Sequence, residues 1–424
     1  MLLAVFGLVV FHAPLSVFFG QFSNPDLVKG WKEIIMLVLI PLVIFSVYRA
    51  GLLKIISRDR LLQLIGIYAA LHLALLLSFK TSMYQSIAGL TIDLRYLLFF
   101  VLVYCVVILW PKSRGLFVKV GIFVAIFSIT FALLQATLLP HDVLKNIGYS
   151  ESTIEPYQTV DKNTDYIRVN GTLRGPNPLG AYIVIIISLL GAWALTHSKS
   201  FIKQKWLFVG SGILLVTTLW ASYSRSAFIA LLVSSIVIIS IIFRKRLNLQ
   251  GIVIAGTVLI LMVSSIVLLR NSSFVQNVIL HDNPTTGSSV DSNEAHVDSL
   301  GQGLERVVRQ PFGAGIGSTG SASLKSDKPL IIENQYLFTA HESGWFGLGL
   351  FVVIYIFILG RLYNYRRDWL SLGVFASGIG LAIVGILLPV WVDDTVSLVW
   401  FGFAAVALGS HFKKETKKKN ATTN

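Results

Sequence analysis

Runs of about twenty apolar residues recur along this chain, the length that a helix needs to cross a hydrocarbon core of about 30 Å. The mean hydropathy is +0.73 and charged residues make up 13% of the chain, whereas soluble domains carry about 25%. The sequence therefore predicts an all-α polytopic membrane protein, with one transmembrane domain over residues 1–424. The twelve predicted spans lie near 1–20, 31–48, 61–79, 94–110, 115–139, 177–196, 205–221, 226–243, 251–270, 343–360, 369–388 and 394–411.

The first apolar run is expected to be a membrane span. It lacks a basic segment before it and an obvious cleavage site, so it does not read as a signal peptide. A chain start further upstream is also compatible with this sequence. The single cysteine, Cys105, lies inside the fourth run, so no intrachain disulfide is expected.

Lysine and arginine gather in every second gap between the apolar runs. Because short cytoplasmic segments of membrane proteins carry an excess of these residues, the alternation predicts which gaps are cytoplasmic. Both termini then lie in the cytoplasm, and residues 412–424 form a basic tail. The sequence pI of about 9.8 reflects this topology rather than nucleic-acid binding. The six basic segments are 49–60, 112–119, 199–205, 244–246, 361–367 and 413–419.

Two long loops, 140–176 and 271–342, are predicted on the opposite, extracytoplasmic face. Long loops in a compact protein usually carry function or are disordered; disorder is expected for 284–293 only. A helix is expected over 294–309, capped by Ser292 or Asn293. Its apolar stripe is Val297, Leu300, Leu304, Val307 and Val308, and a second stripe of His296, Ser299, Gly303 and Arg306 is placed at the edge of a cleft. A solvated amphipathic helix is an equal alternative.

The end of the second loop carries groups suited to proton transfer and anion binding. Glycines within 313–320 can form a nest for phosphate or sugar oxygens, although a plain turn explains them as well. Further on, Glu333 and His341 offer a carboxylate and an imidazole that can act as a general base. Glu333 can equally cap a helix.

Arginines stand at the outer ends of the predicted spans. Arg168 and Arg174, with Asn177, precede the sixth span, and Arg225 occupies a very short turn between the seventh and eighth spans. Ionisable groups there are costly and so are functional candidates, although an arginine can also snorkel to lipid headgroups. Lys32 with Glu33, and Asp93 with Arg95, are expected as local ion pairs, and Asp393 and Asp394 open the last span.

Five short motifs occur in order from 166 to 350: R-V-x-G-T-L-x-G-P-N, S-x-S-R-S-A, R-x-x-x-x-P-x-G-x-G, E-N-Q-Y-L and H-E-S-G-W-F-G-L. In this order and spacing they resemble the O-antigen ligase and polymerase superfamily. The resemblance implies a glycosyltransferase of the bacterial inner membrane that acts in cell-surface polysaccharide biosynthesis. Such enzymes move a glycan from an undecaprenyl-diphosphate carrier to an acceptor hydroxyl, with no metal, cofactor or nucleotide sugar.

The resemblance also implies roles for the candidate residues. Arg168 or Arg174 would hold the diphosphate together with Arg225, and Arg306 would assist. Ligases of the family carry a histidine where this chain has Glu333, so either Glu333 or His341 is expected to be the base. That departure favours a polymerase, or a polymerase-like ligase. The remaining substrate-binding candidates are Asn177, His296, Asn334 and Tyr336.

A transporter or flippase of lipid-linked glycans is the main alternative function. Transporters bind substrate near the bilayer midplane on broken helices. In this chain ionisable residues are nearly absent from the span centres and collect at one face, which favours the enzyme. A structural scaffold, the second alternative, has no need of arginines at the outer span ends.

Overall fold

The computed structural model describes residues 1–79, 82–160, 163–243, 268, 272, 275–276, 292–324, 326–327 and 329–422. Within these residues, ten helices are long and apolar enough to cross a membrane, and Lys205–Ala221 is a shorter apolar helix. These eleven helices correspond to eleven of the predicted spans, and they confirm a multi-pass membrane protein. The remaining predicted span, 251–270, lies outside the described residues except for residue 268.

The spanning helices, in chain order, are α1 to α2 (Leu2–Gly20, interrupted by the 3-10 turn η1, Val9–Phe11), α4 (Trp31–Arg49), α6 (Arg60–Ser78), α7 (Met83–Leu109), α8 (Ser113–Thr137), α9 (Pro176–Thr196), α11 (Lys205–Ala221), α12 (Arg225–Ile242), α16 (Gln335–Asn364), α17 (Trp369–Leu387) and α18 (Asp394–Thr422). Shorter elements connect them: α3 (Pro25–Lys29), α5 (Leu53–Ile56), η2 (Val143–Ile147), α10 (Ser198–Lys203), α14 (Ser292–Arg309), α15 (Gly320–Ser323) and η4 (Val390–Val392).

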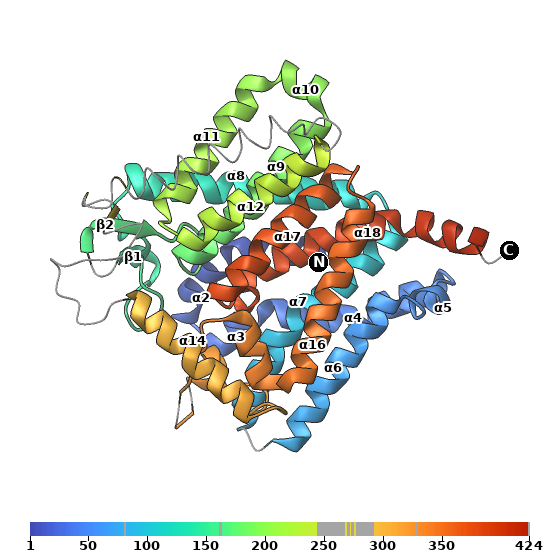
Figure 1. Ribbon diagram of the computed structural model, residues 1–424, viewed down its shortest axis with the longest axis horizontal. Coiled ribbons are helices and arrows are strands. Elements are labelled where there is room, and N and C mark those ends of the chain that lie inside the picture. The colour runs from blue at the N-terminus through green and yellow to red at the C-terminus, as the bar shows by residue number, and fades with distance from the viewer. Residues whose placement is uncertain are drawn as a thin grey trace.

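The core forms around α18 and α7, which pack along each other (Figure 1). Lipid tails are as apolar as leucine, so helices in a membrane associate through close packing, which small residues permit. On α17, a Cβ at Gly380 would lie 2.5 Å from the carbonyl oxygen of Ala230 in α12, and one at Gly373 would lie 2.8 Å from Leu189 in α9. These glycines let α9, α12 and α17 meet at backbone distance.

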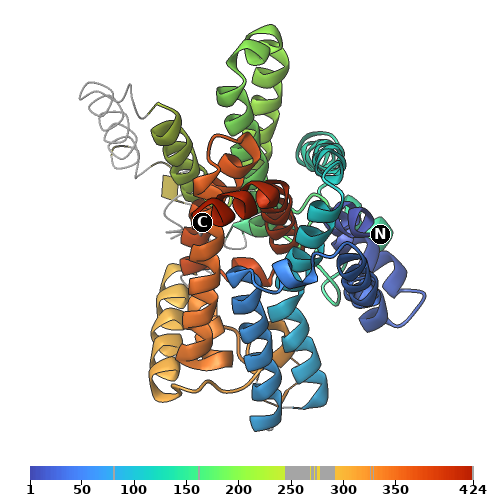
Figure 2. The ribbon, with the colours of Figure 1, turned by 90° about the vertical axis from the view of Figure 1, so that its right-hand side faces the viewer.

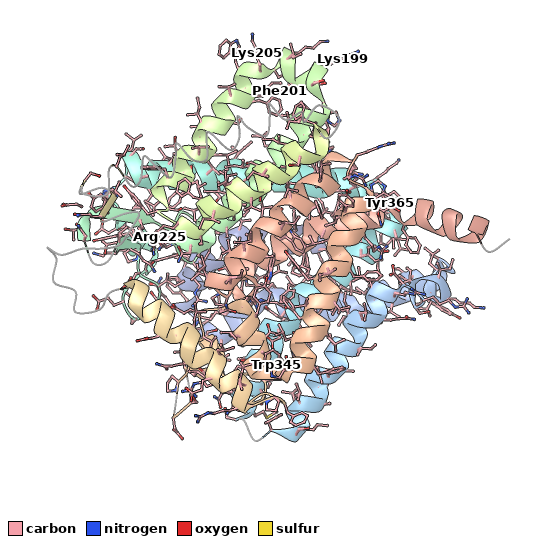
Figure 3. All side chains as sticks on the ribbon, in the orientation of Figure 1. Lys199, Phe201, Lys205, Arg225, Trp345 and Tyr365 are labelled. Atoms are coloured by element: carbon pink, nitrogen blue, oxygen red, sulfur yellow. The ribbon has the colours of Figure 1, made fainter. Side chains whose placement is uncertain are left out.

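Polar contacts tie together the span ends that carry the basic segments. Arg361 binds both carboxylate oxygens of Asp59, at 3.0 and 2.9 Å, and donates to the Tyr104 hydroxyl at 2.9 Å. Arg114 pairs with Asp368, which also caps α17. The two loops predicted on the other face lie at the far ends of the spans: Figure 3 shows Arg225 at the opposite end of α11 and α12 from Lys199 and Lys205. The alternation of charge thus separates the two ends of the bundle.

Two boundaries differ from the prediction. The fourth span begins at Met83, because Ser82 and Gln85 form a reciprocal cap there. The tenth begins at Gln335, and the predicted start at 343 marks a kink instead, where Gly344 adopts φ 71°. The first long loop also contains an unpredicted antiparallel pair, β1 (Tyr157–Val160) and β2 (Asn163–Val169). The segment predicted to be disordered, 284–293, lies outside the described residues up to 291.

Candidate functional site

A cavity of about 310 Å³ opens at the span ends that carry the two long loops. Both loops contribute to its wall. The first contributes Gln158 and Arg174, and the second contributes Gly320, Ser321, Leu324, Ile331, Ile332 and Phe338. The ends of α9, α17 and α18 complete it. Its side chains are mostly apolar, and the polar ones are few. The remaining lining residues are Gly175, Pro176, Asn177, Pro178, Ala181, Val384, Leu388, Pro389, Val390, Val392, Asp393 and Val396.

Arg174 is the exposed cation of this cavity. It stands directly before Gly175, the N-cap of α9, and Pro176 fills the first helical position. The start of a helix carries a partial positive charge that favours anions; in α9 this charge is the main contribution, because Pro176 and Pro178 have no N–H and the Leu179 N–H donates to the Gly175 carbonyl oxygen. Arg174 and the start of α9 therefore make one side of an otherwise apolar cavity suitable for an anion.

Asp393 lies in the same wall. Burial raises the pKa of Asp393 above its ordinary value, and the charge of Asp394 raises it further. The charge of Arg174 opposes these effects in part.

The structure brings Arg168 and Asn177 together with the turn that leads to Arg225. Arg168 donates to Asn177 Oδ1 at 2.6 Å and to the carbonyl oxygen of Ser222 at 3.0 Å. The next residue, Tyr223, adopts φ 46°, a left-handed conformation that is unusual for a residue with a side chain. Arg225 follows as the half-buried first residue of α12. Asn177 lines the cavity, so this arginine-rich corner adjoins it.

The E-N-Q-Y-L motif forms the start of α16, beside the cavity. Asn334 caps the helix: its Oδ1 accepts from the N–H groups of Tyr336 and Leu337, both at 2.9 Å, and its Nδ2 donates to the Ile386 carbonyl oxygen at 2.7 Å. The Tyr336 hydroxyl donates to the Ala382 carbonyl oxygen at 2.8 Å. Glu333 is half-buried and directly follows the cavity residue Ile332. The capping role considered for Glu333 thus belongs to Asn334.

His341 lies farther along α16. It is 3% exposed, and its Nδ1 has no hydrogen-bond partner within the described part of the chain. The next residue, Glu342, is also buried and accepts from the Thr319 N–H at 3.2 Å. This carboxylate and the His341 carbonyl, which accepts from Ala314 at 2.6 Å, fix the glycine-rich segment in place. Backbone N–H groups of that segment are used within the protein, so it is a packed loop and neither an anion nest nor a plain flexible turn.

The helix predicted over 294–309 is present as α14. Gly303 and Val307 pack inward, whereas Leu304 and Val308 are 52% and 62% exposed. A Cβ on Gly303 would lie 3.2 Å from Leu337, so glycine permits this close approach. Within the predicted apolar stripe, Val307 is buried, whereas Leu304 and Val308 are exposed. Arg306 is exposed, and its charge acts on His341. The side chain of His296 lies outside the described part of the structure.

Two histidines with carboxylate partners lie inside spans, although the sequence was expected to have almost no ionisable residues at the span centres. His72, in α6, is fully buried and lies 3.2 Å from Asp93. His12 lies 2.7 Å from Asp394, which also pairs with Lys32 at 2.8 Å and with Arg95. An ionisable residue within an apolar run is the signal that would have found both.

The two expected local ion pairs have different outcomes. Lys32 does contact Glu33, at 3.2 Å. Asp93 and Arg95 do not pair with each other; because they point to different neighbours, Asp93 contacts His72 and Arg95 contacts Asp394. Within the described residues, no three His, Cys, Asp or Glu side chains come together in a way that could hold a metal ion.

Comparison with known proteins places part of this site in a family. Residues 210–352 match the family model described as O-antigen ligase (Wzy_C). The matched region runs from α11 into α16 and includes Arg225, α14 and the E-N-Q-Y-L motif. No curated protein matches the chain. The match agrees with the resemblance carried by the four motifs that lie within this range: residues 210–352 are similar to the O-antigen ligase family.

Proposed function

We propose that this protein is a glycosyltransferase that transfers or polymerises an undecaprenyl-diphosphate-linked oligosaccharide onto an acceptor hydroxyl at the extracytoplasmic face of the bacterial inner membrane. Both termini then lie in the cytoplasm. The observation that carries the proposal is the cavity at the outer span ends, in which apolar walls adjoin Arg174 and the start of α9.

The donor is amphiphilic, and so is this cavity. Its apolar wall, including Val384, Leu388 and Val396, suits the first part of a polyprenyl chain. Arginine binds phosphate oxygens through two parallel hydrogen bonds, and Arg174 stands where the diphosphate would meet the start of α9. Arg225 and Arg168 lie at the adjoining corner. Asn177 contacts both the cavity and Arg168, so it connects the two groups of residues.

The proposed reaction is a displacement at the anomeric carbon of the donor sugar. The acceptor hydroxyl oxygen forms a bond to that carbon, the bond from the carbon to the diphosphate oxygen breaks, and the hydroxyl proton passes to Glu333. The leaving diphosphate retains the electron pair, and the arginines stabilise its charge. We favour Glu333 over His341 because Glu333 adjoins the cavity lining, whereas His341 is buried farther along α16.

Reconstitution of the full-length protein into liposomes with an undecaprenyl-diphosphate oligosaccharide tests the proposal. Glycan elongation or transfer is the expected result, and it should persist in excess EDTA. Movement of the intact donor across the bilayer without any new glycosidic bond would support the flippase alternative and overturn the proposal. Reporter fusions at 155 and 290 test the orientation separately, and both should report an extracytoplasmic position.

A further inference from the structure

Helix α14 presents three different faces. Gly303 and the fully buried Val307 pack against α16 and the segment before it. Successive residues of an α-helix are rotated by about 100°, so Leu304 and Val308 lie on one flank of this packed face and Arg306 lies on the other. The apolar flank is open, with Leu304 52% and Val308 62% exposed. Neither residue is needed for the contact with α16.

The polar flank of α14 is equally open. Glu305 and Arg309 pair at 2.6 Å, and their side chains are 58% and 76% exposed. Two open flanks of opposite polarity indicate that the helix borders two different media. Contact with water explains why the polar flank is exposed, but it does not explain the exposed apolar flank.

The apolar flank continues into a lipid-facing surface of the bundle. After α14 the chain turns back against α16, where the Trp345 N–H donates to the Pro311 carbonyl oxygen at 3.0 Å. Phe312, Trp345 and Phe346 are 82%, 45% and 65% exposed. Trp345 and Phe346 belong to a spanning helix, so the medium around them is lipid. Tryptophan is enriched at the boundary between lipid and water.

The direction of α14 agrees with this placement. Figure 1 shows α14 running across the direction shared by α6, α9 and α12, near the span ends that carry the two long loops. Figure 2 shows it beside α16, with which it makes direct contacts. A helix that crosses the span direction at the end of a span lies in the plane of the bilayer surface.

We infer that α14 is an interfacial helix that docks on the outer lipid leaflet, with Leu304, Val308 and Phe312 inserted among the lipids. Its polar flank, with Glu305, Arg306 and Arg309, faces water. The helix is thereby held at the depth of the lipid headgroups, level with the cavity mouth. This inference concerns a lipid-binding surface and is independent of the proposed transfer reaction.

Site-directed spin labelling tests it on the full-length protein in phosphatidylcholine and phosphatidylglycerol vesicles. Single cysteines at Leu304, Val308 and Phe312 are compared with matched cysteines at Glu305 and Arg309, which are about as exposed on the other flank. The buried Cys105 is checked for labelling in the unmodified chain. All these positions are on the surface, so folding is retained, and an unchanged elution profile verifies this for each variant.

The nitroxides at 304, 308 and 312 should collide several-fold more often with oxygen than with a water-soluble nickel chelate. Those at 305 and 309 should show the reverse preference. Equal access of the nickel chelate to both flanks would place the whole helix in water and overturn the inference. Exclusion of both reagents at 304 and 308 would show a protein contact instead of lipid, and would overturn it as well.

Discussion

At the scale of single residues, Arg225 carries the most specific expectation. It begins α12 two residues after the left-handed Tyr223, in the turn whose Ser222 carbonyl accepts from Arg168. Arg225→Ala should lower the transfer rate by about 100-fold or more, because the leaving diphosphate loses a charged donor. Arg225→Lys should also be weak, since lysine lacks the bidentate fork. Initial rates in proteoliposomes measure both, with insertion and elution compared to wild type. A near-normal rate for Arg225→Ala would remove this arginine from the mechanism.

Substitutions of Glu333 and His341 distinguish which of the two residues accepts the proton of the acceptor hydroxyl. Glu333→Gln keeps the side-chain shape but cannot accept the proton, so turnover should fall by about 100-fold while donor binding is unchanged. His341→Ala should have the smaller effect on turnover, because His341 is buried away from the cavity lining. Single-turnover kinetics and donor binding separate the two steps. Full activity of Glu333→Gln with an inactive His341→Ala would reverse the assignment, and two active variants would exclude both as the base.

The sequence motifs grouped candidate residues that lie together in the structure, but they did not reveal the contacts that each side chain makes. Arg168 and Asn177 were grouped from the motif, and they are joined at 2.6 Å. Asn334 was expected to bind substrate, yet its side chain is used to cap α16 and to hold Ile386. A short motif does not reveal whether an amide faces a ligand or its own helix. Contacts such as that between His72 and Asp93 join separate spans, so they depend on helix packing.

At the scale of elements, two arginines of α14 that are three residues apart lie in different surroundings. Arg306 acts electrostatically on His341, whereas Arg309 pairs with Glu305 on the exposed flank. Arg306→Glu should reduce transfer by about 10-fold or more, because the resemblance gives Arg306 an assisting role toward the diphosphate and the change puts a negative charge there. Arg309→Glu is the matched control and should change the rate little. It breaks only an exposed ion pair, and such pairs contribute about 0–1 kcal/mol to stability. Equal losses from both changes would contradict this orientation of α14.

Helix periodicity located α14 correctly and identified its apolar stripe, but it did not show which residues pack against the bundle. Leu304 and Val308 of that stripe are exposed. In the structure Gly303 takes the inward position, because a residue without a side chain lets α14 approach Leu337 closely. In a membrane protein the exposed face can also be apolar, so hydrophobicity alone does not fix the buried side. The strands β1 and β2 were missed because they are only four and seven residues long.

At the scale of the whole molecule, Asp368 links three helices at the end opposite the cavity. It caps α17 and pairs with Arg114 of α8, and His411 of α18 lies 3.7 Å away. Burial alone would raise the pKa of Asp368, but the neighbouring His411 and Arg114 outweigh it and lower the pKa below its ordinary value. A depressed carboxyl pKa stabilises the fold above the unfolded value, near 4, and this contribution is lost as pH falls.

Asp368→Asn should therefore lower the melting temperature at neutral pH: asparagine still caps α17, but the charge that pairs with Arg114 is lost, at a cost of about 1 kcal/mol or more. The difference between variant and wild type should narrow as pH falls below about 4. Thermal unfolding in detergent, measured from neutral pH to below pH 4, gives the difference in melting temperature between variant and wild type. A difference that is constant with pH would mean that the charge of Asp368 does not contribute. Exposed Asp142, which pairs with Lys145 on the other face, offers a control.

Twelve apolar runs and alternating charge were enough to predict the multi-pass architecture and the separation of the two bundle ends, because both follow from the cost of placing polar groups in lipid. The cavity was not predictable in the same way. Its wall joins residue 158 to residue 396, and only the packed helices bring such distant segments together.

Site-specific photocrosslinking tests the central claim, that the outer cavity binds the lipid-diphosphate donor. A photoreactive amino acid replaces Leu324, which lines the cavity, or Leu138, an exposed residue at the outer end of α8. Radiolabelled undecaprenyl-diphosphate oligosaccharide should crosslink at 324 and not at 138, and unlabelled donor should compete for the reaction. Equal labelling at both positions, or labelling at 324 that donor does not displace, would contradict the account.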